Sequence, residues 1–226
     1  MVMMSLEQLT ERIGESPALN NPFYDIWMSR RFDIGELKVF ARNYGEWVKS
    51  FPNMLAVLFF STDDLNAKTE YVKTLHSEMG HGIPEKVHWR LLDAFFEELS
   101  SKLGHDGQLD RDRLEREICL LPSTRKLIEG ERRLYGNESR EVAVGAQMAL
   151  EWQAYTMLRQ LYEGARKYIE LWKNPDKFHE DCEYFYVHIG ATEKKHKEES
   201  LNAARRYATN KRSIAEITRG YNEHLD

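Results

Sequence analysis

Acidic residues and histidines occur in three separate groups along this chain, each within a segment that is predicted to be helical. In chain order the groups are Glu78 with His81 and His88, then Glu151 alone, and then His188 with Glu193 and His196. Carboxylates and imidazoles that several helices bring to one point are what a helical bundle uses to hold two iron or manganese ions. The pattern therefore predicts a redox metal centre.

The first group spans a break between two helices. Glu78 lies near the end of one predicted helix, and His88 lies in the first turns of the next, after a glycine- and proline-containing break. Such a break lets two successive helices direct ligands at one point. His81 is a reserve ligand, because it lies three residues after Glu78 and shares its face if the helix continues. The alternative is that His81 is a polar loop residue and that His88 caps nearby groups.

Glu151 stands in an apolar stretch of a long predicted helix, between Leu150 and Trp152. A carboxylate on an apolar face is costly unless it is paired or binds a cation. Metal binding is one explanation. The alternatives are a neutralised or salt-bridged side chain, or a solvent-facing one beside Gln147 and Gln153.

The third group does not fit one face of a regular helix. At about 100° per residue, Thr192 lies about 40° and His196 about 80° from His188, whereas Glu193 lies about 140° away. One extra residue accommodated as a π-bulge between His188 and Glu193 would bring the acid into line, and such bulges cluster at functional sites. The alternative is that Glu193 belongs to a solvated run of charges. Thr192 is a reserve ligand.

The elements that must position these groups are helices almost throughout, so we predict an all-α fold. No alternating strand pattern and no internal repeat is found. Helical periodicity marks residues 5–13, a segment from about 21, and 33–50, 54–60, 63–79, 85–103, 125–135, 139–172 and 178–207. Pro52 is expected to break or kink the chain between two of these segments. The polar tail, residues 208–226, is expected to be loosely held.

Length and composition restrict the class of protein. A chain of 226 residues is expected to form one domain, residues 1–226. A net charge of −5 gives no reason to expect nucleic acid or an anionic membrane as a partner. No apolar run approaches the roughly 18 residues of a membrane span, and the first residues lack the pattern of a signal peptide. Two cysteines make no disulfide framework. We therefore expect a cytoplasmic protein.

Taken together, these motifs resemble the haem-oxygenase-like diiron oxidases and oxygenases. The shared features are a Glu-x-Gly motif with a downstream histidine, a Leu-Glu in mid-chain and a C-terminal helix with His, an acid and His. The superfamily shares its fold with TenA-like and PqqC-like proteins, and the CADD-like proteins are the most similar in pattern. The resemblance covers roughly residues 20 to 205 and implies a haem-oxygenase-like bundle of about seven helices.

By this resemblance, five residues match metal ligands, namely Glu78, His88, Glu151, His188 and His196. The last motif departs from the family pattern. Thr192 stands where the family has an acid and Lys195 where it has the second histidine, while Glu193 and His196 keep the acid-to-histidine spacing one position later. Either a bulge restores this helix as a source of ligands or it supplies fewer of them.

The resemblance implies chemistry with molecular oxygen at two Fe(II) ions, with Mn as a possible substitute. Known outcomes in the family are N-oxygenation, oxidative C–C cleavage, and formation of alkenes or nitriles from small amphiphiles such as amino acids. We expect a small-molecule substrate, a homodimer and an external electron donor. Aromatic residues at helical spacing are candidates for the pocket wall, although most such residues are simply core: Tyr44, Trp47, Phe95, Tyr155 and Tyr162.

Two other functions remain open at this stage. One is a cofactor-free or TenA-like hydrolase of the same fold, which needs an activated cysteine. Neither Cys119, beside Leu120, nor Cys182, between Asp181 and Glu183, has a setting that activates a thiol. The other is a non-enzymatic binding or interaction protein. Metal content separates the oxidase from both.

Overall fold

Every regular element in the described part of the chain is a helix. The computed structural model describes residues 5–189 and 191–226, and for residues 191–194 it describes the backbone alone. The α-helices among these residues are α1 Leu6–Glu11, α2 Pro22–Ser29, α3 Ile34–Ser61, α4 Leu65–Glu78, α5 His88–Lys102, α6 Arg111–Glu117, α7 Pro122–Tyr135, α8 Arg140–Ala165, α9 Pro175–Asp181, α10 Glu183–Ile189, α11 Ala191–Tyr207 and α12 Lys211–Leu225. The all-α prediction is confirmed, with twelve α-helices in these ranges where about seven were expected. None of the described helices is long and apolar enough to cross a bilayer.

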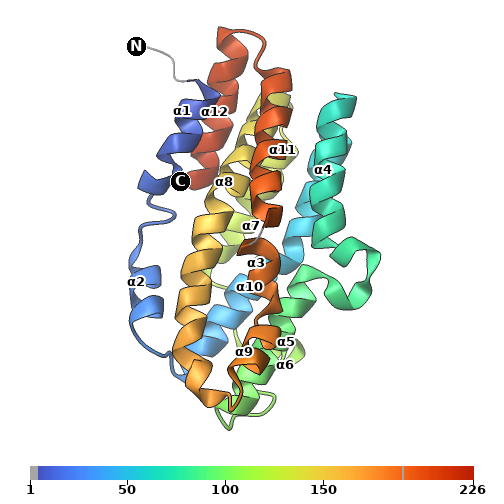
Figure 1. Ribbon diagram of the computed structural model, residues 1–226. Coiled ribbons are helices and arrows are strands. Elements are labelled where there is room, and N and C mark those ends of the chain that lie inside the picture. Colours follow the sequence, from blue (N-terminus) through green and yellow to red (C-terminus); the bar gives the residue numbers. More distant parts are fainter. Residues whose placement is uncertain (1–4, 190) are drawn as a thin grey trace.

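Helix α8 is the centre of the bundle (Figure 1). It packs against α12, α11, α2, α10 and α7. Helix α3 crosses the same bundle and packs against α7, α4 and α5. As a result, α4, α8, α10 and α11, which carry the acid and histidine groups together with the start of α5, all converge on the middle of the molecule.

Local sequence explains where the long helices begin. Asp33 caps α3, because its side chain accepts a hydrogen bond from the backbone N–H of Glu36 while the Glu36 side chain accepts one from the Asp33 backbone. Asp64 caps α4 and Ser139 caps α8 in the same way through one side-chain bond each. These caps fix the start of each helix, and with it the face that each later residue presents.

Three expectations about the helices were wrong. The break expected at Pro52 is wrong, since α3 continues through Pro52 to Ser61 as one helix, while the alternative of a kink there stays a prediction. The long helix from 139 ends at Ala165, and a 3₁₀ segment, Arg166–Leu171, follows. The tail that was expected to be loosely held forms α12, whose Ile217 and Tyr221 are buried against α8. Helix α12 is polar on average, so its one apolar face is not apparent from its composition.

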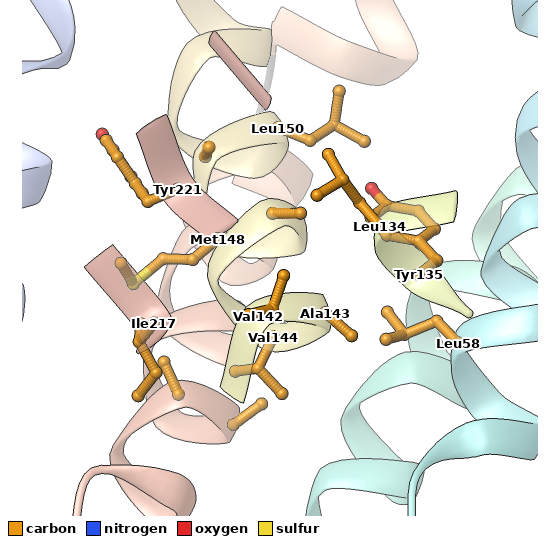
Figure 2. Packing of buried hydrophobic residues seen from close by; sticks show 14 of the residues in the cluster. Leu58, Leu134, Tyr135, Val142, Ala143, Val144, Met148, Leu150, Ile217 and Tyr221 are labelled. Carbon is orange, nitrogen blue, oxygen red and sulfur yellow. The ribbon is translucent and has the colours of Figure 1, made fainter. Parts of the chain in front are cut away.

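The apolar core is divided into two clusters. One joins α8 to α12, α7 and α3, and Figure 2 shows Val142, Met148 and Ile217 packed together within it. The other joins α3, α5, α10 and the second half of α8, and it contains Phe95, Phe185 and Leu158. Trp47 packs against both clusters. Five of the predicted ligands are buried, namely Glu78, His88, Glu151, His188 and His196, and the pocket that four of them line is bordered by residues of both clusters.

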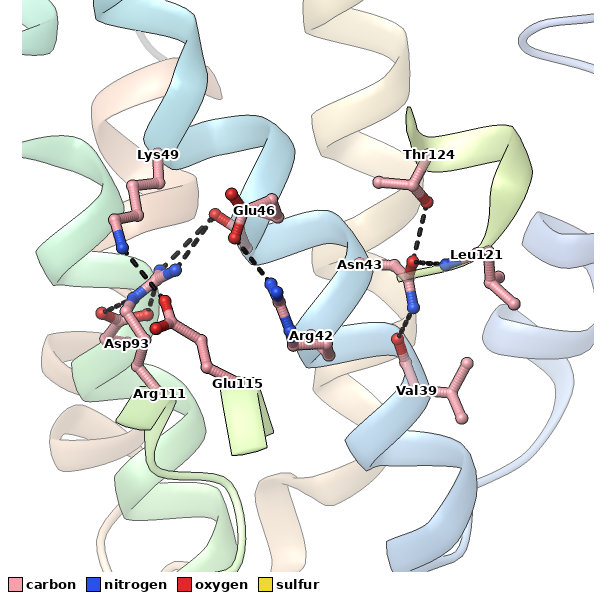
Figure 3. Close-up of polar contacts among 11 residues, drawn as sticks. Val39, Arg42, Asn43, Glu46, Lys49, Asp93, Arg111, Glu115, Leu121 and Thr124 are labelled. Atoms are coloured by element: carbon pink, nitrogen blue, oxygen red, sulfur yellow. Dashed lines mark hydrogen bonds and ion pairs between the residues drawn. The ribbon is translucent and has the colours of Figure 1, made fainter. Parts of the chain in front are cut away.

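Polar contacts hold α3 to the shorter helices α5, α6 and α7 (Figure 3). Arg111 of α6 donates two hydrogen bonds to Asp93 of α5, at 2.5 and 2.7 Å, and its guanidinium also donates to the carbonyl oxygen of Gly45 in α3, at 3.5 Å. On the opposite side of α3, the Asn43 side-chain oxygen accepts bonds from the Leu121 backbone and the Thr124 hydroxyl, both at 2.8 Å. Because these bonds are partly buried and in pairs, they fix the position of α3 and therefore of Trp47.

Candidate metal centre

Glu78 lies between two histidines that come from different helices. It is the last residue of α4 and is 5% exposed. Its Oε2 atom lies 3.0 Å from His88 Nδ1, and its Oε1 atom lies 3.6 Å from His188 Nε2. One ligand atom from each of the three residues lies within 4.8 Å of the others. This is a compact set of one carboxylate and two imidazoles, all buried.

A tight turn brings Glu78 and His88 together. After α4 the backbone passes through three left-handed residues, Gly80 (φ 62°), His81 (φ 54°) and Gly82 (φ 84°), before α5 begins at His88. A Cβ atom at Gly80 would lie 2.4 Å from the carbonyl carbon of Lys86. Glycine at position 80 therefore permits the close approach of the two sides of the turn.

We predict that Gly80→Ala destabilises the protein and lowers its iron content. Both effects follow because the new methyl group must push residues 86–88 away from α4. Gly82→Ala is the matched control, since it has the same sign of φ but nothing lies within 4 Å of its Cβ position. The control should cost only about 1–2 kcal/mol of left-handed strain. Thermal unfolding and iron analysis of both variants test this. Equal iron content in both variants would contradict it.

The hydrogen bonds of His188 leave its Nε2 atom available as a ligand. Nδ1 of His188 lies 2.7 Å from the carbonyl oxygen of Tyr184, one turn earlier in α10. A carbonyl only accepts, so Nδ1 carries a proton, and Nε2, which faces Glu78, is the ring atom directed at the cluster. A backbone carbonyl bound to one ring nitrogen is the usual way to orient a metal-binding histidine. His88 Nδ1 is buried and makes no hydrogen bond despite its short distance from Glu78.

Glu151 and His196 form a second buried pair of candidate ligands. Glu151 is 4% exposed on α8, and its Oε1 atom accepts a hydrogen bond of 2.5 Å from Gln147, one turn earlier. Its Oε2 atom lies 3.7 Å from Nδ1 of His196, which is 5% exposed on α11. The solvent-facing alternative for Glu151 is therefore wrong. The two residues share one pocket with Glu78 and His188.

The protonation states of these groups suit a cation. Burial alone would raise the pKa of the Glu78 carboxyl, but His88 and His188 outweigh it and lower that pKa well below the usual range. Burial lowers the pKa of His196 to about 4, so this imidazole is neutral at pH 7. Ionised carboxylates and neutral imidazoles are the forms that bind metals. The donor set of oxygen and nitrogen atoms fits iron or manganese.

A small apolar pocket adjoins the four residues. Its cavity volume is about 40 Å³. Its walls are Trp47, Val48, Phe51, Leu150, Ala154, Met157, Leu158 and Tyr184, and Glu78, Glu151, His188 and His196 line it as well. A pocket with apolar walls and one polar end is typical of a site for a small ligand.

The structure places the remaining predicted residues as follows. His81 is exposed beside His76, away from the cluster, because its left-handed backbone turns it outward. The side chains of Thr192 and Glu193 lie outside the described residues. The predicted bulge depends on Gly190, which is outside them too. Helix α10 ends at Ile189, and α11 begins at Ala191.

Of the five residues expected in the pocket wall, Trp47 alone lines it. Tyr44 supports the wall from behind, with its hydroxyl 2.6 Å from that of Tyr184. Phe95 is fully buried core against Phe185. The other two lie elsewhere, Tyr155 beneath Lys197 and Tyr162 in contact with His179.

Sequence reasoning missed two residues that hold this site together. Tyr184 lines the pocket and orients His188 through its carbonyl, and Gln147 binds Glu151. Each precedes the residue it supports by four positions, which on a helix is the same face. A search for polar or aromatic residues one turn before each candidate ligand would have found both.

Comparison with known proteins identifies the family. A family model described as an iron-containing redox enzyme, of the haem-oxygenase type, matches residues 38–226, a range that includes every residue of the centre. The chain belongs to this family. The resemblance inferred from the motifs is therefore confirmed, and the protein is an iron-containing redox enzyme at the level that the family defines.

Solved structures agree on the fold. Two crystal structures of a CADD-like protein of unknown function from Nostoc punctiforme each match 97% of this chain. The matches cover 90% and 87% of that protein, with TM-scores of 0.73 and 0.70. Sequence identity is 16% and 15%, so the likeness concerns the fold alone.

One curated relative also matches. It is named 4-aminobenzoate synthase and comes from Chlamydia pneumoniae, and it is 26% identical over 122 residues. The match covers 52% of this chain and 54% of the relative, so the chain spans about half the length of the curated relative it matches.

Proposed function

We propose that this protein is an oxidase or oxygenase that binds two Fe(II) ions and acts on a small amphiphile with molecular oxygen. The observation that carries the proposal is the buried set of Glu78, His88 and His188 beside Glu151 and His196 in one pocket. The first three residues would hold one ion, and the other two would supply ligands to the second. Iron held in this way supplies one-electron steps that activate oxygen.

The residues around the pocket support the same function. The apolar wall excludes water from the reacting centre, which protects it from side reactions. Trp47, Phe51 and Tyr184 offer flat surfaces to an apolar or aromatic group of the substrate. No lysine or arginine is present among the described residues that line the pocket. A substrate carboxylate would therefore bind the metal ions and leave its apolar part against the wall.

We infer that the substrate is an amino acid or a derivative of one. The reactions that we propose for this substrate are N-oxygenation, oxidative C–C cleavage, and nitrile or alkene formation. The name of the curated relative adds formation of an aromatic amine such as 4-aminobenzoate to that set. The aromatic wall of the pocket favours testing aromatic substrates first.

A hydrolase based on a cysteine nucleophile has no support. Burial and the neighbouring Asp181 raise the pKa of the Cys182 thiol, which keeps it protonated and inert. Cys119 is exposed and is absent from the residues that line the pocket.

The test is to load the protein with Fe(II) under anaerobic conditions, measure iron per chain, and then follow oxygen uptake. We expect two irons per chain and oxygen uptake that rises when an amino acid with an apolar side chain is present. Products are identified by mass spectrometry. Retention of less than one iron per chain, or oxygen uptake no faster than that of free iron, would refute the proposal.

A further inference from the structure

A row of buried polar side chains leads away from Trp47. The Trp47 Nε1–H group donates a hydrogen bond of 2.7 Å to Oε2 of Glu131 on α7. Oε1 of Glu131 lies 3.7 Å from Nδ1 of His224 on α12. Nε2 of His224 lies 3.0 Å from the side-chain amide of Gln153 on α8. The row thus joins four helices through side chains that have no part in the acid and histidine cluster.

Glu131 and His224 are buried against each other, and among the described residues neither pairs with a permanently charged side chain. Each side chain is only 1% exposed. Burial raises the pKa of Glu131 to about 8, although the hydrogen bond from Trp47 acts to lower it. Burial lowers the pKa of His224 to about 4. At pH 7 the pair is therefore a neutral acid facing a neutral imidazole.

The facing atoms of this pair are free to exchange a proton. Oε1 of Glu131 and Nδ1 of His224 form no hydrogen bond with any other described residue. A small rotation of the carboxyl group brings the two atoms within bonding distance. If the Gln153 amide group turns by 180°, its oxygen and nitrogen exchange places. The oxygen can then accept a hydrogen bond from the Nε2–H group of His224.

One end of this row lies at the candidate metal pocket, and the other lies at a groove between α7 and α12. Trp47 lines the pocket that Glu78, Glu151, His188 and His196 share. Glu131 and His224 lie at the base of a groove between α7 and α12, whose rim carries charged residues including Lys126 and Glu223. The row therefore connects the candidate metal pocket with a solvent-facing groove across the core.

We propose that Trp47, Glu131 and His224 form a relay that couples electron transfer to proton transfer and reduces the oxidised metal centre one electron at a time. The proposal rests on the proposed function, because it requires iron that oxygen has oxidised. Tryptophan is among the side chains most readily oxidised by one electron. A cation on its buried indole ring would be costly, so loss of its proton to a bonded acceptor makes the oxidation easier.

The charges balance in one concerted shift. With oxidised iron in the site, the indole of Trp47 would give one electron to the iron and its Nε1 proton to Oε2 of Glu131. The Oε1 proton of Glu131 moves to Nδ1 of His224. The products are a neutral indolyl radical and an imidazolium at the groove. One electron from an external one-electron reductant, with the protons returning along the same row, restores Trp47.

The test detects the radical directly and does not depend on turnover. Protein carrying ring-deuterated tryptophan is loaded with Fe(II), mixed with oxygen without substrate, frozen within milliseconds and studied by electron paramagnetic resonance. We expect a neutral tryptophan radical whose hyperfine pattern changes with the label. Trp47→Phe should abolish it. Glu131→Gln, which keeps the acceptor for the indole N–H but cannot pass on a proton, should lower its yield at least tenfold.

Controls separate the relay from the metal site. Glu129→Gln changes an exposed carboxylate on the same helix and should leave the signal unchanged. His224→Gln is a second relay variant, and it should act like Glu131→Gln. Normal iron binding and oxygen uptake without a tryptophan radical, or a radical that Glu131→Gln leaves unchanged, would overturn the relay alone. Absence of iron binding or oxygen uptake in the unmodified protein would overturn the proposed function and the relay with it.

Discussion

Replacing Glu78 with alanine is expected to remove nearly all of the iron from this protein. Among the described residues, Glu78 is the one whose carboxylate faces both His88 and His188, at 3.0 and 3.6 Å. Its loss leaves His88 and His188 in an apolar setting without the carboxylate charge that would offset a dication. We expect iron affinity to fall by more than about 100-fold, beyond the 10–100-fold typical of residues that only support a ligand. Equilibrium dialysis with Fe(II) under anaerobic conditions measures this.

His88→Ala and His81→Ala form a matched pair for the same experiment. Both remove an imidazole from the α4–α5 region, but His88 is 3% exposed and faces Glu78, whereas His81 is exposed beside His76. His88→Ala should lose at least one iron per chain. His81→Ala should retain the full content. Equal iron loss in the two variants would mean that the cluster around Glu78 is not the metal site.

Gly145→Ala is expected to cause a large loss of stability. A Cβ atom at Gly145 would lie 2.0 Å from the carbonyl oxygen of Ile217 in α12. The reverse contact is equally close, since a Cβ atom at Gly220 would lie 2.0 Å from the carbonyl oxygen of Val142. The methyl group can be accommodated only if the two helices separate. We expect a cost of about 3 kcal/mol or more in the free energy of unfolding.

Gly130→Ala is the control for that substitution. Gly130 lies within α7, and nothing is found within 4 Å of its Cβ position. Alanine is the better helix former, so this variant should gain about 0.5–1 kcal/mol. Chemical denaturation of both variants gives the two values. A cost of less than about 1 kcal/mol for Gly145→Ala would show that α12 is not held closely against α8.

The residues that the sequence singled out for metal chemistry proved easier to place than the pocket around them. Glu78, His88, Glu151, His188 and His196 lie together because each is a charged or titratable group that a helical pattern places on an apolar face. Such a group needs a partner, and few partners are available inside a bundle. The free-energy cost of burying such a group without a partner is therefore what makes it recognisable in the sequence.

Aromatic residues carry no such signal. Tyr155 and Phe95 have the same helical spacing as Trp47, but which neighbour each one meets depends on how helices distant in sequence are rotated against one another. His81 shows the same limit for the backbone, because a left-handed conformation at a residue other than glycine is not predicted by local preference. The packing of α12 was concealed by its mean polarity, although Ile217 and Tyr221 lie on one face.

The position of the donor residues along the chain determines when the centre can be assembled during synthesis. Glu78 and His88 meet across a short turn, so this part of the site can form as soon as α4 and α5 have left the ribosome. Glu151 follows much later, and His188 and His196 later still, on helices that dock against α8. Chains fold progressively from the N-terminal end as they emerge. We therefore expect iron to bind stably only late in synthesis. An incomplete chain that ends before α10 should not retain iron.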